Sequence, residues 1–338
     1  MSKQSVFVVP FSRLSLSWMG EQEASLSRGG QAIGRALQMM EEREDLHFLV
    51  ENLVFVDAYL KAHPEALDSV RERVAQGRLE VGAAWTEIGQ NLQVGEDLVR
   101  NLLYGKRWGV EVLGSDCPTA CLGDAAGLTS QYPQIARKCG VTQVVFTQSG
   151  PRDATLLRWR GLDGGEVEVW YARIDYDLLW AAVRGTPAKR RERNRQIAAE
   201  RAQCSGLLPI HWGGDLTPMS EAALEDLIEW AEGEEIVLGT PGGYFREIPK
   251  DLPELSGEVP SALPFLESVF PGVTPLNVPA VHGLLRAEQM AAVAGMVFGF
   301  PFPEEALKTA WLQQLEAMAC GFDGTGAGEA LERRRQIQ

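Results

Sequence analysis

Two aspartates stand where a pair of carboxylates could do chemistry. Asp124 closes the apolar strand in CLGDAAG, and Asp215 closes the apolar strand in HWGGD. Both have glycine beside them, which lets a ligand or another backbone segment come close. Hydrolysis of a glycosidic bond needs such a pair, with one carboxylate as nucleophile or base and the other as acid. An aspartate after a strand is also a common N-cap of the next helix, and this capping role stays open for both residues.

The stretch after the first expected strand brings different groups to the same place. Residues 6–10, VFVVP, form that strand, and the residues just beyond a strand of a parallel sheet face the ligand site. Among the residues that follow, as far as Trp18, the sole charged group is Arg13. Of the four histidines, His211 at the end of a later strand is the one placed to meet a ligand, and a core histidine is the alternative.

Composition and motifs argue against other classes of function. The net charge of −14 argues against nucleic acid or an anionic membrane as the main partner. The sequence has no Gly-rich phosphate loop, G-x-S-x-G elbow or H-E-x-x-H helix. Cys117 and Cys121 have no nearby histidine or second cysteine pair, so we expect buried thiols and not a metal site. Five cysteines and no secretory signal predict a cytoplasmic protein.

Strand-like runs alternate with helical periodicity along most of the chain, which favours a parallel sheet with crossover helices. A helical stretch breaks at Pro64, and Asp163-Gly164 is placed at the turn of a hairpin over residues 156–172. Residues beyond about 283 read as helices only. The sequence therefore predicts an α/β domain over residues 1–275 and a helical C-terminal segment over 276–338 that packs on it.

Several gapped motifs occur in the order found in glycoside hydrolase family 38, the α-mannosidases. GRLEVGAAWTEIGQNLQVGEDLVRNLLYGKRWGVEVLG (77–114), LGDAAGLTSQYPQIARKCGVTQVVFTQ (122–148) and RWRGLDGGEVEV (158–169) each resemble a segment of that family. The resemblance implies a seven-stranded parallel β/α barrel followed by a short helical bundle segment, and a retaining mechanism assisted by zinc. Asp124 matches the family's nucleophile, which is also a zinc ligand. Trp18 matches the tryptophan on which the sugar stacks.

The resemblance also implies that the family's zinc site is lost. Two zinc ligands of the first strand fall on Arg13 and Ser15, and a late histidine ligand falls on Phe322. Only Asp124 of the four ligands is retained, whereas a catalytic zinc normally has three protein ligands. We therefore expect no metal and no other cofactor.

These features leave three functional hypotheses. The first is a zinc-independent retaining glycosidase with a carbohydrate-facing cleft. The second is a non-catalytic sugar-binding or interaction subunit, in which Arg13 only neutralises Asp124 and the chain forms a homo-oligomer or joins a partner subunit. The third is a zinc enzyme with substitute ligands such as Asp323, His282 or Glu87. The predicted catalytic residues are Asp124 and Asp215, and the predicted substrate-binding residues are Trp18, Arg13, His211 and Glu87.

Overall fold

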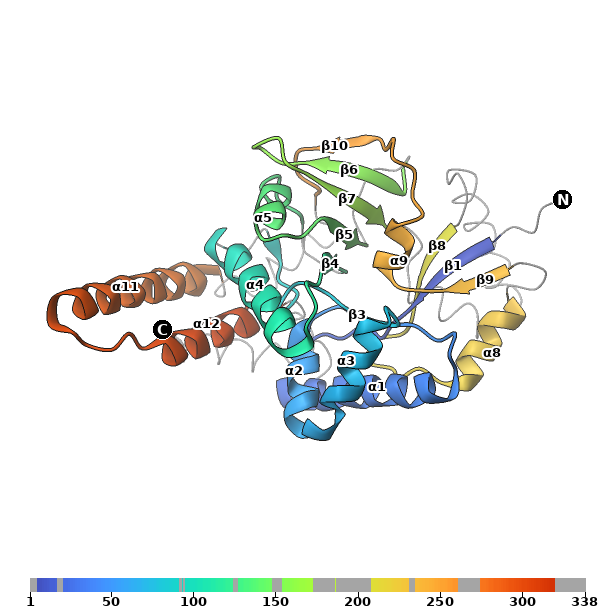
Figure 1. Cartoon of the computed structure of the whole chain (residues 1–338). Helices are drawn as coiled ribbons and strands as arrows, with labels where there is room; N and C mark the ends of the chain where they lie inside the picture. Colours follow the sequence, from blue (N-terminus) through green and yellow to red (C-terminus); the bar gives the residue numbers. More distant parts are fainter. Residues whose placement is uncertain are drawn as a thin grey trace.

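Figure 1 shows a computed structural model of the chain. The structure describes residues 5–16, 21–90, 93, 95–123, 127–147, 154–172, 186, 208–230, 235–260 and 274–319. Two of the predicted site residues, Asp124 and Trp18, lie outside the described residues, as does Asp323.

The strands follow the alternating β/α order that the sequence predicts, and most neighbouring strands run parallel. β1 (Ser5–Pro10) lies between β8 (Leu208–Trp212) and β9 (Glu235–Leu238). β2 (Phe48–Val50) pairs with β3 (Leu79–Val81). The third sheet has the order β10 (Glu254–Ser256), β6 (Leu156–Arg160), β7 (Glu166–Tyr171), β5 (Gln143–Phe146) and β4 (Thr119–Leu122). The predicted α/β class is therefore confirmed.

Single contacts join the three sheets to one another. A parallel bridge between Phe11 and Leu49 links β1 to β2. The amide of Ala83 donates to the carbonyl of Thr119 at 2.8 Å and links β3 to β4. Within the described part of the chain, no ladder joins β7 to β8, and the sheets are small. The seven-stranded closed barrel therefore stays a prediction.

Alternate residues of the parallel strands meet in an apolar interior. Side chains along a strand point to opposite faces in turn, so every second residue shares one face. One face of each of several strands contributes to this cluster, with Phe7, Val9, Phe11, Leu49, Cys121, Val145 and Trp170 among its members. The opposite face of β1, represented by Val6 and Val8, packs into the larger core that includes side chains of the surrounding helices. Packing on both faces of the strands therefore fixes the strand ends that lie above the interior cluster.

The helices pack around the strands in sequence order (Figure 1). They are α1 (Gln22–Glu42), α2 (Leu53–Ala62), α3 (Leu67–Ala75), α4 (Gly95–Trp108), α5 (Tyr132–Lys138), α8 (Glu221–Trp230), α9 (Pro241–Phe245), α11 (Thr274–Phe298) and α12 (Glu304–Ala317). The break at Pro64 is confirmed, because α2 ends two residues before it and a single turn leads into α3. No described helix has the length and apolar character needed to cross a membrane. The cytoplasmic location stays a prediction.

The predicted hairpin is also confirmed, since β6 and β7 are antiparallel. Gly164 has a φ of 80°, which a glycine adopts without strain, and the amide of Gly165 donates to the Asp163 carboxylate at 2.9 Å. The turn residues read from the sequence therefore act as expected.

The helical C-terminal segment forms an arm of two helices (Figure 1). α12 packs on the rest of the molecule through Trp311 and Leu315, which are fully buried. α11 extends beyond α12, away from the sheets, and much of it is exposed. The arm is thus attached mainly by α12 and by the first part of α11.

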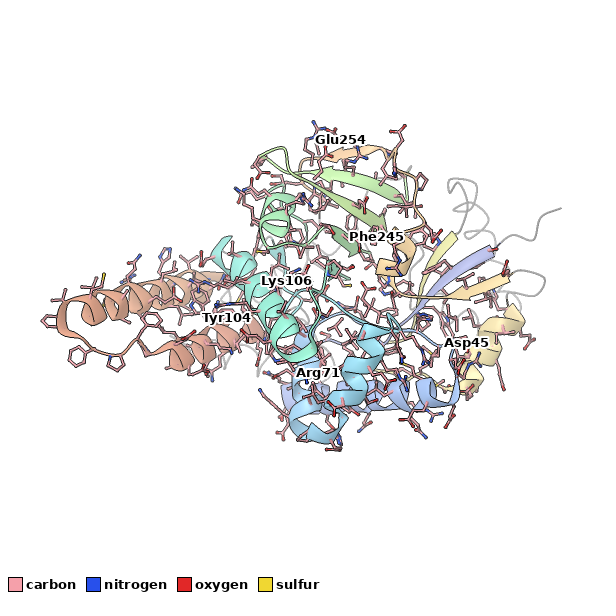
Figure 2. The ribbon with its side chains drawn as sticks, in the orientation of Figure 1. Asp45, Arg71, Tyr104, Lys106, Phe245 and Glu254 are labelled. Carbon is pink, nitrogen blue, oxygen red and sulfur yellow. The ribbon has the colours of Figure 1, made fainter. Side chains whose placement is uncertain are left out.

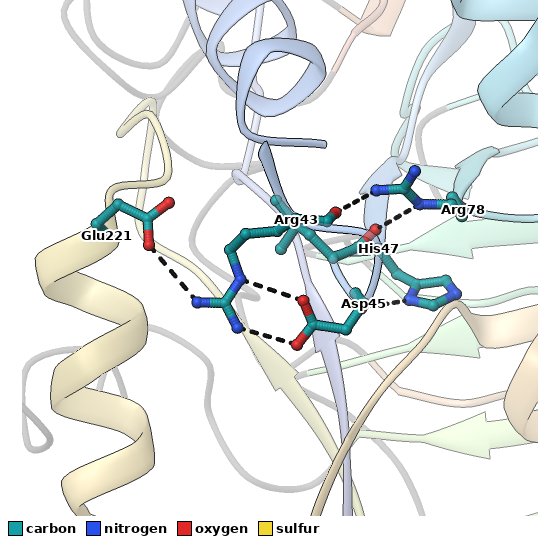
Figure 3. Close-up of polar contacts among 6 residues, drawn as sticks. Arg43, Asp45, His47, Arg78 and Glu221 are labelled. Carbon is teal, nitrogen blue, oxygen red and sulfur yellow. Dashed lines mark hydrogen bonds and ion pairs between the residues drawn. The ribbon is translucent and has the colours of Figure 1, made fainter. Parts of the chain in front are cut away.

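An ionic cluster fixes the opposite, amino-terminal ends of β2 and β3 (Figure 3). Arg43, directly after α1, donates to the Asp45 carboxylate at 3.2 and 2.9 Å and lies 3.6 Å from the Glu221 carboxylate at the start of α8. Arg78 donates to the backbone carbonyl of Arg43. Because these residues precede parallel strands, they lie at the end remote from Arg13. We assign this cluster to stability.

Candidate functional site

The first strand continues past Pro10 and places Arg13 beside Asp215. The amide of Phe11 donates to the Trp212 carbonyl at 3.1 Å, and the amide of Arg13 donates to the Gly214 carbonyl at 3.2 Å. Arg13 and Asp215 then form a parallel bridge through their backbones. Two residues predicted for the site therefore lie at the ends of adjacent parallel strands, where ligand sites of such sheets occur.

The Arg13 side chain lies between two buried carboxylates. Its Nη1 donates to Oε2 of Glu51 at 2.9 Å, and its Nη2 forms an ion pair with Glu87. The side chains of Arg13, Glu51 and Glu87 are 3%, 2% and 5% exposed. A guanidinium presents its donors in a fixed planar fork, which suits carboxylates on two sides. These three residues come from the ends of β1, β2 and β3, and we call them the arginine cluster.

The end of β4 approaches the same guanidinium closely. A Cβ added at Gly123 would lie 3.1 Å from Cζ of Arg13 and 3.2 Å from Oε1 of Glu51, which is tighter than ordinary contacts. Only glycine leaves room for this approach. The hydroxyl of Thr147, at the end of β5, donates to the carbonyl of Gly123. Asp124 follows Gly123 directly in the chain, so the arginine cluster lies next to the strand end that carries it.

The loop that carries Glu87 is held from two sides. The Thr86 amide donates to Oδ1 of Asn101 at 2.9 Å, and Nδ2 of Asn101 donates to the Thr86 carbonyl at 2.7 Å. The Thr86 hydroxyl donates to the Leu315 carbonyl at 3.3 Å. α4 and α12 therefore position the carboxylate of Glu87 through the residue next to it.

Sequence reasoning did not single out Glu51. The signal was present, because Glu51 follows a buried apolar strand in LHFLVEN just as Asp124 and Asp215 follow theirs. A buried carboxylate at a strand end was treated as a candidate only where glycine stood beside it. Arg13 and Glu87 were predicted for the site, and the structure brings them into direct contact.

The model of the glycosyl hydrolases family 38 N-terminal domain matches residues 3–263. The chain belongs to this family. Alpha-mannosidase G of Dictyostelium discoideum is 24% identical over 258 residues, which are 73% of this chain and 23% of that protein. Human Alpha-mannosidase 2C1 is 24% identical over 178 residues, which are 50% of this chain and 17% of that protein. The chain thus spans less than a quarter of the length of these relatives.

Solved structures share the fold. An alpha-mannosidase from Enterococcus faecalis V583 superposes with a TM-score of 0.82 at 20% identity, over 99% of this chain and 41% of that chain. A 4-alpha-glucanotransferase from Thermococcus litoralis gives a TM-score of 0.60 at 15% identity, over 100% of this chain and 58% of that chain. At such identities the likeness establishes the fold alone.

Among the described residues, the chemistry at Arg13 does not suit the zinc ion that the family resemblance implies, whose other implied positions Asp124 and Phe322 lie outside the described residues. At the first-strand position of a metal ligand, this family 38 chain has the Arg13 cation, and the two nearest described carboxylates are paired with it. In the described ranges, no three His, Cys, Asp or Glu side chains are grouped as metal ligands. His282, a suggested substitute ligand, is exposed on α11, whereas Glu87 belongs to the buried arginine cluster. A bound cation beside a fixed guanidinium is electrostatically unfavourable.

His211 lies in the apolar interior, below the arginine cluster. It is 1% exposed, its ring centroid is 3.7 Å from that of Phe11 in a stacked arrangement, and Trp170 is 5.7 Å away. Its register partner on β1 is Val9, and this is the next-to-last pair of the ladder. Its predicted contact with substrate stays a prediction.

The cysteines expected to be buried are buried. Cys117 and Cys121 are free thiols with 2% and 1% exposure. Burial raises the pKa of the Cys117 thiol to about 11. Burial, with the charges of Glu51, Glu80 and Glu87 in the same direction, holds the pKa of Cys121 well above its ordinary value. Both side chains are therefore neutral thiols at physiological pH.

Proposed function

We propose that this family 38 chain acts on carbohydrate without zinc and is a retaining glycosidase built on the seven-stranded β/α barrel of its family. The observation that supports it is the buried Arg13 cation, paired with Glu51 and Glu87 where a metal ligand is expected. The relatives are named alpha-mannosidases, which supports a glycoside as the ligand class. Because the chain covers only part of those relatives, activity of this chain alone belongs to the proposal.

In this proposal Asp124 attacks the anomeric carbon and forms a glycosyl-enzyme, while Asp215 protonates the leaving oxygen and then activates the water. Retaining enzymes place the two carboxyl groups about 5–5.5 Å apart. Trp18 stacks on the sugar, and Glu87 and His211 border the cleft. Arg13, held by its two carboxylates, supplies a fixed cation on this side of the cleft.

A second candidate is a non-catalytic sugar-binding or interaction subunit. It is favoured by the near-complete burial of Arg13, whose two terminal nitrogens are both in ion pairs within the protein. A guanidinium with both terminal nitrogens in such ion pairs stabilises the strand ends and has few donors left for a ligand. Under this candidate Asp124 is an N-cap or a binding group, and the chain acts through a partner subunit or a homo-oligomer.

The deciding experiment is hydrolysis of a panel of aryl glycosides that includes 4-nitrophenyl α-mannoside, with protein dialysed against chelator. The glycosidase proposal expects turnover unaffected by chelator, retention of configuration by NMR, and loss of turnover in Asp124→Asn. Glu225→Gln, an exposed change on α8, serves as the control variant. Sugar binding by calorimetry with no turnover on any substrate supports the second candidate. Activity that needs added zinc overturns the proposal.

A further inference from the structure

The outer part of the arm exposes an unusual amount of apolar surface. Residues 289–303, QMAAVAGMVFGFPFP, contain no charged side chain in a protein with a net charge of −14. We call the following residues the apolar tip, each at least 50% exposed: Met290, Val293, Met296, Phe298, Phe300 and Phe302. The largest apolar patch on a typical monomer is about 300–600 Å². Six large apolar side chains that are exposed to this extent on one short segment form a patch of that size.

Exposed apolar side chains occur around the outer part of α11 and are not confined to one stripe. A surface helix normally turns one apolar stripe to the core and polar residues to water. Past Glu288, α11 has no charged residue, and its contact with α12 covers only part of it. A helix that is apolar all round is ordinarily buried. The tip therefore has the composition of an interface core.

A hollow lies where the arm meets α4. Its volume is about 590 Å³. Tyr104 and Trp108 of α4 form one wall, and Ala292 of α11 and Leu312 of α12 contribute to the other. Figure 2 shows Tyr104 on the side of α4 that faces the arm. Phe302 borders both the hollow and the apolar tip, so the two surfaces are continuous. Charged side chains of α4, α11 and α12 complete the lining, so the aromatic and apolar walls are the part that suits an aromatic group.

We propose that two copies of this chain associate with their arms antiparallel, the apolar tip of each seated in the hollow of the other. A molecule that carries both a protruding apolar group and a matching hollow is self-complementary, and a two-fold axis closes the pair. The hollow lies at α4, so in this pair the two arms lie side by side and each tip reaches α4 of the other copy. The two-fold axis makes each tip–hollow contact twice, and a standard interface buries roughly 800 Å² per partner.

Charge favours a second copy at this place. Two bodies with a charge of −14 each repel one another, and this repulsion falls with distance. The arm extends away from the sheets (Figure 1), so contact through the tips keeps the acidic bodies apart. The uncharged tip and the mixed charges around the hollow, including Arg107 and Glu305, add no like-charge clash.

Sedimentation equilibrium from low to high micromolar concentration tests the proposal. Wild-type protein is expected to approach twice its mass of 37.1 kDa. The tip variant Phe298→Glu/Phe300→Glu and the hollow-filling variant Ala292→Trp are each expected to weaken association by about tenfold or more. Leu162→Glu replaces an equally exposed apolar residue at the β6–β7 turn and is expected to leave association unchanged. Circular dichroism checks that each variant is folded, and Met296→Lys replaces the tip variant if that protein does not fold.

Mixing the two variants separates this arrangement from others. In a mixed pair, the intact tip of the Ala292→Trp chain meets the intact hollow of the tip variant, so association is expected to recover partly. Recovery would not occur if tips met tips. A wild-type chain that stays monomeric, a tip variant that associates like wild type, or a mixture without recovery overturns the proposal. If the wild-type chain is monomeric, the apolar tip is instead expected to bind a different polypeptide.

Discussion

Nη1 of Arg13 lies 2.9 Å from Oε2 of Glu51, and both side chains are almost fully buried at the ends of strands that neighbour one another through the Phe11–Leu49 bridge. Removing such charges from water costs several kcal/mol for each ion, which only good pairing offsets. The second pairing, to Glu87, brings in β3. The cluster therefore ties three strand ends together around one cation.

Arg13→Ala is expected to lower the free energy of unfolding by about 3–5 kcal/mol, because it leaves two buried carboxylates without their cation. Urea unfolding followed by circular dichroism measures the loss. Arg43→Ala is the matched control, since it removes an arginine from the more exposed cluster of Figure 3 and is expected to cost about 0–1 kcal/mol. Equal losses in the two variants would contradict the burial of the arginine cluster.

Zinc is expected not to raise the melting temperature of wild-type protein, because only a ligand that binds the folded state more tightly than the unfolded chain raises it. The matched variant is Arg13→His/Ser15→Asp/Phe322→His, which restores the ligand types that the family resemblance implies beside Asp124. Elemental analysis and thermal unfolding with and without zinc check both proteins. Binding of about one zinc ion per wild-type chain would refute the proposal that the Arg13 cation takes the place of a metal ligand.

Glu316 gives a pH dependence of stability. Its carboxylate accepts hydrogen bonds from Nε1 of Trp85 at 3.1 Å and Nε2 of Gln22 at 2.8 Å, yet burial outweighs them and raises its pKa. The folded state thus keeps the proton to higher pH than the unfolded chain does. From this group, the free energy of unfolding falls as pH rises from the ordinary carboxyl range through the raised pKa.

Glu316→Gln is expected to remove that fall and to gain stability relative to wild type as pH rises from 4 towards neutrality. Urea unfolding at a series of pH values measures it. The exposed change Glu225→Gln should leave the pH profile as it is in wild type. A larger loss of stability in Glu316→Gln at neutral pH than at low pH would show the opposite sign.

The buried thiols are expected to resist a thiol reagent. With a pKa of about 11, Cys117 is ionised in about one molecule in a thousand at pH 8, and Cys121 is less accessible still. A variant with Ser at positions 139, 204 and 320 leaves only these two cysteines. We expect no reaction in the folded variant and two equivalents in urea, and rapid reaction of the folded variant would contradict the burial.

The features predicted correctly from sequence depend on neighbours in the chain. Pro64 breaks a helix and Asp163-Gly164 makes a turn because each acts within a few residues. The predicted helical segment begins at residue 276, although helical periodicity is readable only from about 283, and α11 begins at Thr274. Pro275 fits a first turn, and Pro279 lies early in α11, where it removes one hydrogen bond and crowds the preceding turn. Tertiary packing therefore keeps a proline-rich stretch helical.

The site depended on distant neighbours and was only partly predictable. Arg13 was singled out by its place after the first strand, but its described carboxylate partners are 38 and 74 residues away in the chain. Which acids reach it is decided by the pairing of β1, β2 and β3. Glu51 is therefore identified as part of the site from the fold and not from the sequence around it.

The arginine cluster also constrains how this lineage can change. A single replacement of Arg13 leaves Glu51 and Glu87 charged and buried, so the intermediate is unstable before any metal ligand is complete. Loss of either glutamate first leaves the guanidinium underpaired. A metal site at this position would therefore require several simultaneous replacements, and the paired charges act as a barrier to stepwise change.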